Sequence, residues 1–310
     1  MNKENFLDEE IRNGYTISTN IKKLWEIQLS IISEIDRICQ KYEIEYFADG
    51  GTFLGAIRHQ GFIPWDDDID ISMTRDNYEK FKQVVTKELN SNFFFQDNET
   101  EKNFFRVHGQ VRKNNTTMMI KYDYGKKYHR GVFVDIFIYD KVPLAEKLDN
   151  KLRNKLELLR KILVYKNEVY ETGIKKIIKN IIGNLGVILF GGFNNTVKKF
   201  DKLCKKYNDL TDGYYYDLVG YYTNKRKLKF DKALLEEKTI YRKFEYLEIK
   251  TINDYDTYLT NMYGKDYMVP KQAPNDHGNV YIDLDNPYTI YDSLTREQFE
   301  DLFDGQKVKN

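Results

Sequence analysis

An acidic run follows a pair of glycines near the beginning of the chain, and together they predict a site for a metal ion and phosphate. In an extended strand over residues 66–71, Asp68 and Asp70 would share one face while Ile69 and Ile71 enter a core. Two carboxylates this close repel each other unless a divalent cation or an arginine cluster neutralises them. Oxygen ligands favour Mg²⁺ or Mn²⁺, which proteins hold with carboxylates and substrate phosphate.

The glycine pair predicts a tight junction between a strand and a helix. Residues 44–48 are typical of a strand and residues 52–59 of a short helix, with Gly50 and Gly51 between them. Without Cβ atoms, these glycines let a phosphate approach backbone amides at the start of the helix. Thr52 would cap that helix or contact the phosphate. Alone the junction is an ordinary turn, but beside the acidic run it indicates an enzyme that breaks a phosphoanhydride bond.

A third carboxylate, Asp135, is the only charge in the apolar run of residues 131–138. A strand this apolar is buried on both faces, so its lone aspartate must be paired or must coordinate an ion. Asp135 would therefore complete a two-metal site. The alternative is a structural aspartate bonded to backbone amides or to Arg112. The acidic run has its own alternative, a hydrophilic loop that caps a helix, although the preceding Pro64-Trp65 and the apolar alternation favour the metal site.

The surrounding periodicity predicts an α/β fold with a mixed sheet. Helices are expected from residue 18 to about residue 38 and over 75–89, the second capped by Thr74. Strands over 93–96, 105–113 and 132–139 complete a catalytic core, residues 18–143. Residues 1–17 are polar and acidic and are expected to be a flexible arm.

Composition sets limits on partners and location. The 310 residues carry a net charge of +1, which argues against nucleic acid as a bulk electrostatic partner. The mean hydropathy is −0.66, and no apolar run reaches the roughly 18 residues of a membrane span. The two cysteines and the polar start of the chain are typical of a reduced, cytoplasmic protein.

Residues 144–210 form a basic helical region that differs from the rest of the chain. Over 146–206 there are 15 Lys and Arg against 6 Asp and Glu, a net charge of +9. Within it, residues 181–193 are apolar and glycine-containing, and they would rest on the inner face of an anionic membrane. The alternative is a buried helical hairpin. Residues 211–310 would close over the site, with a helix over 254–262.

The motifs resemble those of the LicD family, the group that includes fukutin-like proteins and has a nucleotidyltransferase-type core. The matching segments are DGGTFLGAIRHQGFIPWDDDIDI (49–71), VRKNNTT (111–117), GVFVDIF (131–137) and YGKDYMVP (263–270). The resemblance implies a nucleotidyltransferase-like core with a helical insertion and a C-terminal closing segment.

The resemblance also implies the reaction. A phospho-alcohol, with phosphocholine the first candidate, would move from a CDP-linked donor such as CDP-choline to a hydroxyl of a cell-surface glycan, teichoic acid or capsule precursor, and CMP would leave. The acceptor would be a free or lipid-linked glycan. Magnesium or manganese would be held by three aspartates, and five residues would bind the donor phosphates. Carried over by position, the metal ligands are Asp68, Asp70 and Asp135, and the phosphate-binding residues are Gly50, Gly51, Thr52, Arg58 and Arg112.

Several assignments stay open at this point. The proton acceptor would be Asp135 or Asp66, and His277 would act as a base or phosphate contact unless it is a surface-loop histidine. Arg58 would otherwise pair with one of the aspartates. Two other functions remain: a nucleotidyltransferase that moves a nucleotide from a nucleoside triphosphate to RNA, protein or a small molecule, and a noncatalytic glycan-assembly protein.

Overall fold

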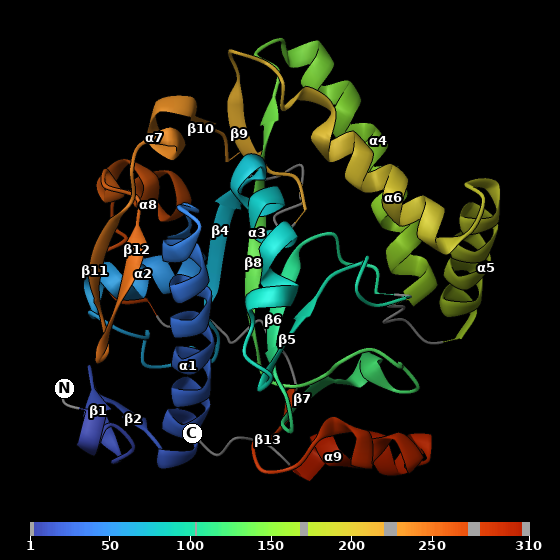
Figure 1. The fold of residues 1–310 in the computed structure, drawn as a ribbon. Helices are drawn as coiled ribbons and strands as arrows, with labels where there is room; N and C mark the ends of the chain where they lie inside the picture. The colour runs from blue at the N-terminus through green and yellow to red at the C-terminus, as the bar shows by residue number, and fades with distance from the viewer. Residues whose placement is uncertain (1–2, 103, 168–172, 220–227, 272–279, 306–310) are drawn as a thin grey trace. The chain divides into compact units, whose positions relative to one another are not determined.

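The chain leaves its first folded unit twice, over residues 96–109 and 137–236. The structure is a computed structural model that describes residues 3–102, 104–167, 173–219, 228–271 and 280–305 (Figure 1). The first unit comprises residues 1–95, 110–136 and 237–310, and the second comprises residues 96–109 and 137–236. The second unit is therefore an insertion in the chain of the first, and it contains the basic region 144–210.

The first unit combines short strands with helices that bury one apolar stripe. Its elements begin with η1 (Lys3–Asn5), β1 (Glu10–Arg12), β2 (Tyr15–Ile17), α1 (Thr19–Lys41), β3 (Phe47–Ala48), α2 (Gly50–Arg58), β4 (Asp70–Thr74), α3 (Arg75–Glu88) and β5 (Phe93–Gln96). They continue with β6 (Gly109–Lys113), β7 (Thr117–Ile120), η2 (Lys121–Asp123), β11 (Ile240–Phe244), β12 (Leu247–Thr251), α8 (Tyr255–Tyr263), β13 (Val280–Asp283), η4 (Tyr288–Ser293) and α9 (Arg296–Gly305). Strand β8 (Phe133–Val142) begins in the first unit and ends in the second.

Strand β4 lies between β3 and β8 in the main sheet of the first unit. Strands β3 and β4 are antiparallel, with Ala48 opposite Ile71, and β6 pairs with both β5 and β8. Helix α1 begins where the sequence predicts, because the Ser18 hydroxyl accepts a hydrogen bond from the Ile21 amide. The α/β fold class is confirmed.

Three strands begin later than the sequence predicts. The strand expected over 44–48 begins at Phe47, the strand expected to contain Asp68 begins at Asp70, and the strand expected from residue 105 begins at Gly109. In the second case the carbonyls of Asp66 and Asp67 accept hydrogen bonds from helix α1, as described below.

The N-terminal residues are not the flexible arm expected from their polarity. Strands β1 and β2 form an antiparallel hairpin, and Phe6 is fully buried. Arg12 donates to both carboxylate oxygens of Glu245, at 2.7 and 3.1 Å. Lys22, buried in α1, donates to Glu10 at 2.6 Å. These partners hold the hairpin because a buried charge is retained only when it is paired.

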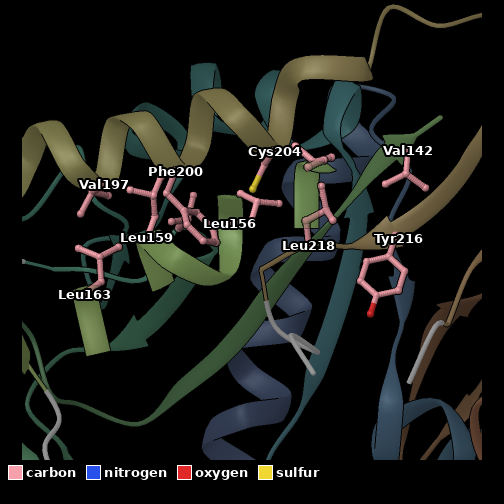
Figure 2. Close-up of a cluster of buried hydrophobic side chains, with 11 residues drawn as sticks. Val142, Leu156, Leu159, Leu163, Val197, Phe200, Cys204, Tyr216 and Leu218 are labelled. Carbon is pink, nitrogen blue, oxygen red and sulfur yellow. The ribbon is translucent and has the colours of Figure 1, made fainter. Parts of the chain in front are cut away.

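The second unit packs helices against the end of β8. Its elements are α4 (Glu146–Asn167), α5 (Gly173–Leu189), α6 (Phe193–Cys204), η3 (Lys205–Tyr207), β9 (Tyr214–Asp217), β10 (Phe230–Asp231) and α7 (Lys232–Glu236). Figure 2 shows its core, in which α4 and α6 contribute leucines, Val197, Phe200 and Cys204 around Val142 and Tyr216. Residues 211–236 thus belong to this unit, whereas the segment predicted to close over the site was expected to begin at residue 211.

No single helix in the described part of the chain is long and apolar enough to cross a membrane. Helices α5 and α6 with η3 pass the same criteria only as a pair, with a bend of 77° between them.

Candidate active site

The glycine turn is built around a buried aspartate that sequence reasoning left unassigned. Asp49 follows β3 as the N-cap of α2, and its Oδ1 accepts a hydrogen bond from the Gly50 amide at 2.6 Å. Gly50 has φ +51°, a left-handed conformation that favours glycine. The Ser72 hydroxyl donates to Asp49 Oδ2 at 2.5 Å, and the Tyr258 hydroxyl donates to Oδ1. Helix α8 of the C-terminal segment therefore fixes the start of α2.

The turn and the acidic run are in direct contact. A Cβ atom on Gly51 would lie 2.5 Å from Oδ2 of Asp66, so only glycine allows this carboxylate to approach the turn. Thr52 Oγ1 accepts a hydrogen bond from the Asp70 amide at 2.9 Å. Thr52 thus joins α2 to β4. Its predicted contact with phosphate remains a prediction.

Three consecutive carboxylates gather just before β4. One oxygen from each of Asp66, Asp67 and Asp68 lies within 4.8 Å of the other two, and all three residues are partly exposed. Helix α1 holds their backbone: Trp25 Nε1 donates to the Asp66 carbonyl at 3.0 Å, and Gln28 Nε2 donates to the Asp67 carbonyl at 2.8 Å. Helix α1 therefore fixes the backbone of the acidic run, which lies in a partly exposed loop before β4.

Asp70 lies among other carboxylates, and their negative charges change its pKa. Burial raises the pKa of Asp70 well above its ordinary value, and the charges of Asp68, Asp135, Asp49 and Asp66 raise it further, in that order. The acidic run and the β8 aspartate thus act on one carboxyl group. Such a cluster favours a bound cation, because a cation relieves repulsion that protonation would otherwise relieve.

Asp135 is held by a relay of side chains within the first unit. Its amide donates to the Ile69 carbonyl at 3.2 Å, which places it beside the beginning of β4. Gln110 Nε2 donates to Asp135 Oδ1 at 2.6 Å, and Arg112 Nη2 donates to Gln110 Oε1 at 2.6 Å. Arg112 also donates to the Gly131 carbonyl at 2.6 Å and is buried. The donor-phosphate role of Arg112 stays a prediction, and the bonds described here make it part of the support for Asp135.

A neutral histidine lies beside this relay. The Gly131 amide donates to His129 Nδ1 at 3.1 Å, so the ring proton lies on Nε2, 3.0 Å from Asn114 Oδ1. Burial, followed by the positive charges of Arg112 and Arg130, lowers the pKa of His129 to about 3. Protonation of Nδ1 would break the bond from Gly131.

Arg58 ends helix α2 without a carboxylate partner. Its Nε donates to His59 Nε2 at 2.9 Å and its Nη1 donates to the Tyr267 carbonyl at 2.9 Å. Among the residues that the structure describes, Arg58 forms no ion pair with an aspartate, which was the alternative role. Burial lowers the pKa of Arg58. Burial, followed by the positive charge of Arg58, lowers the pKa of His59 to about 4. A guanidinium with only neutral partners is suited to an anion.

The predicted site residues that the structure describes all belong to the first unit, and they are Gly50, Gly51, Thr52, Arg58, Asp68, Asp70, Arg112 and Asp135. His277 lies outside the described residues. The sequence analysis missed Gln110, Trp25 and Gln28, which position the carboxylates. The only available signal was a polar residue in an apolar pattern, as with Gln28 on the buried face of α1.

A glycine turn packed on an acidic strand, with a third carboxylate on the neighbouring strand, defines a nucleotidyltransferase-like site. The model of the LicD/FKTN/FKRP nucleotidyltransferase domain matches residues 43–155, which contain that turn and all three strands. The chain belongs to the LicD family, because the match to a relative described next extends over most of both chains.

That relative is the lipopolysaccharide cholinephosphotransferase LicD of Haemophilus influenzae, which is 31% identical over 243 residues, 77% of this chain and 88% of the relative. An uncharacterized protein of Rickettsia prowazekii is 28% identical over 145 residues, 47% of this chain and 49% of that protein. The ribitol 5-phosphate transferase FKRP of Mus musculus is 34% identical over 76 residues, 23% of this chain and 15% of FKRP.

Proposed function

We propose that this protein is a phosphotransferase that moves a phospho-alcohol, most simply phosphocholine, from a CDP-linked donor to a hydroxyl of a cell-surface glycan. The observation that carries the proposal is the 31% identity to a lipopolysaccharide cholinephosphotransferase over 77% of this chain. A second relative is a ribitol 5-phosphate transferase, so both named relatives transfer an alcohol phosphate. The CDP-linked donor, the glycan and the cytoplasmic location are parts of the proposal.

The donor set fits a hard divalent cation. Asp68, Asp70 and Asp135 would hold Mg²⁺ or Mn²⁺, because they offer only oxygen ligands and already raise the pKa of Asp70 by their mutual repulsion. The oxygens of Asp66 and Asp67 are close enough to Asp68 to add to this set. When bound, the cation would supply charge stabilisation to the phosphate oxygens.

The residues of the turn would bind the donor phosphates. Gly51, at the start of α2, lies beside the Asp66 carboxylate, and a helix N-terminus favours negative charge. Arg58, which donates to His59 and to the Tyr267 carbonyl, would add a positive charge beside a phosphate. Phosphoryl transfer depends mainly on such positioning and charge stabilisation.

The proposed reaction is an in-line displacement at one phosphorus atom. The acceptor oxygen forms a bond to the phosphorus that carries the alcohol, and the bond from that phosphorus to the bridging oxygen breaks. The bridging oxygen leaves with CMP. The acceptor hydroxyl proton passes to a carboxylate, with Asp135 and Asp66 as the two candidates on this chain.

The test is CMP release from a panel of CDP-linked alcohols, with Mg²⁺ or Mn²⁺ and a glycan acceptor. We expect CMP release that requires the cation. Asp68→Asn, Asp70→Asn and Asp135→Asn should each lower turnover by at least about a hundredfold, since each removes a charge from the site. Asp140→Asn is the matched control, because Asp140 is also a buried aspartate of β8 and bonds to Asn208.

Three results would count against the proposal. If pyrophosphate forms from a nucleoside triphosphate while CDP-alcohols are inert, the protein is a nucleotidyltransferase. If no cation-dependent turnover occurs with any donor, the result favours a noncatalytic glycan-assembly protein. Loss of activity in Asp140→Asn equal to that in Asp135→Asn would show that general destabilisation explains the effect.

A further inference from the structure

Helix α5 in the second unit exposes its apolar side. Eight isoleucine and leucine side chains between residues 174 and 189 are 47–83% exposed, with Leu189 the most exposed. At 100° per residue these side chains fall within an arc of about 140° on one side of the helix. An amphipathic helix of a soluble protein normally buries its apolar side, whereas α5 exposes it.

The opposite side of α5 explains this exposure. Gly183 packs on the backbone of Tyr165, and Gly186 packs on the side chain of Ile162, so that α5 approaches α4 through its glycines. Figure 1 labels the two helices. A Cβ atom on either glycine would lie less than 3 Å from α4. The close contact with α4 thus requires glycine, and it leaves the isoleucine and leucine side chains facing away from α4.

Positive charge is concentrated in the helix that carries this apolar stripe and in the helix that follows it. Helix α5 carries Lys175, Lys176 and Lys179 and no acidic residue. From residue 173 to residue 206 there are eight lysines against one aspartate, a net charge of +7. Lys198, Lys199 and Lys202 of α6 belong to this set.

We propose that α5 lies in the surface of an anionic membrane, with its isoleucine and leucine side chains among the acyl chains and the lysines of α5 and α6 at the lipid phosphates. Charge decides between this occupant and a second copy of the chain. Two copies meeting through α5 would bring together two segments that each carry a net charge of +7, whereas an anionic bilayer neutralises such a segment. With 17 residues, α5 is about 26 Å long and suits a position along the interface.

This proposal does not depend on the transfer reaction. It would bring the enzyme to a lipid-linked acceptor, but the surface is defined by α5 and α6 alone. Site variants and α5 variants should therefore separate the two proposals: Asp68→Asn should bind vesicles normally, and α5 variants should turn over a soluble acceptor normally.

The experiment is flotation of the full-length protein with vesicles of phosphatidylcholine alone or with 30 mol% phosphatidylglycerol, a fraction on the order of that in anionic membranes. We expect binding to the anionic vesicles that weakens in high salt. The double variant Ile178→Ser, Leu185→Ser should lower the partition coefficient at least about tenfold. Lys198→Gln and Lys199→Gln should each lower it about fivefold. Ile290→Ser is the matched control, because Ile290 is 50% exposed in the first unit.

The substituted side chains are exposed, so circular dichroism and thermal unfolding should match those of the unchanged protein. Failure to bind anionic vesicles would overturn the proposal, and so would equal binding by the double variant. Sedimentation that shows dimers, dissociated by the same double variant, would assign the stripe to a second copy and would also overturn it.

Discussion

The relay from Gln110 to Asp135 offers a sharp test of how the site is held. Gln110→Met keeps the length and the burial of the side chain but removes two hydrogen bonds of 2.6 Å, one to the Asp135 carboxylate and one from the Arg112 guanidinium. Each involves a charged group, and such bonds contribute about 1.5–3 kcal/mol. We expect the free energy of unfolding to fall by about 3 kcal/mol, and the melting temperature by about 5 °C.

The same substitution should change the chemistry. An outer partner that orients a metal-binding carboxylate typically contributes 10–100-fold to metal affinity or activity. We therefore expect the Mg²⁺ concentration for half-maximal CMP release by Gln110→Met to rise by about 10–100-fold. The KM for the donor should change little, because Gln110 does not lie at the glycine turn.

Gln96→Met is the control for stability. Gln96 is also fully buried and also donates to a carboxylate, that of Glu101, which is remote from the acidic run in sequence. It should lower the melting temperature similarly and leave the Mg²⁺ dependence unchanged. If Gln110→Met retained the Mg²⁺ dependence of the unchanged protein, Gln110 would not position a metal ligand.

Three further predictions concern single residues. Gly51→Ala should displace the Asp66 carboxylate, lower turnover at least about tenfold and reduce the free energy of unfolding by about 1 kcal/mol. The control Gly125→Ala should leave turnover unchanged. Equal turnover by the two variants would contradict a role for the contact between Gly51 and Asp66. Arg58→Gln should raise the donor KM about 10–100-fold in initial-rate assays, and an unchanged KM would remove Arg58 from the phosphate site. The pKa of His129 is about 3 when folded and about 6.5 when unfolded, so its stabilisation is complete above pH 6.5 and is lost as the pH falls. Denaturant unfolding should lose about 2 kcal/mol between pH 7 and pH 5 through this residue. His129→Gln should reduce that loss of stability. If NMR shows that folded His129 titrates near pH 6.5, the lowered pKa is wrong.

The sequence predicted the centre of the site because its signals are local. Gly50 is required by a left-handed turn, and Ile69 and Ile71 are fully buried while Asp68 and Asp70 are not. Alternation and glycine content report such features directly. Whether the three aspartates hold a metal stays a prediction.

Long-range partners explain what the sequence did not show. The backbone of the acidic run, just before β4, is held by Trp25 and Gln28, about 40 residues earlier. The N-terminal hairpin is held by Glu245, more than 200 residues later. No local pattern at residues 1–17 contains this information, and their polarity therefore led to a wrong prediction of a flexible arm.

In the second unit, too, the local sequence did not decide between two predictions. Residues 181–193 were expected either to meet a membrane or to form a buried hairpin, and periodicity alone could not decide between them. The decisive feature is which side of α5 faces α4, and the glycines at 183 and 186 determine it. The described residues predicted to do chemistry all belong to the first unit, whereas the exposed apolar stripe and the excess of lysine belong to the second. The two units therefore carry separable properties, and substitutions in α5 should change where the enzyme binds without changing how it reacts.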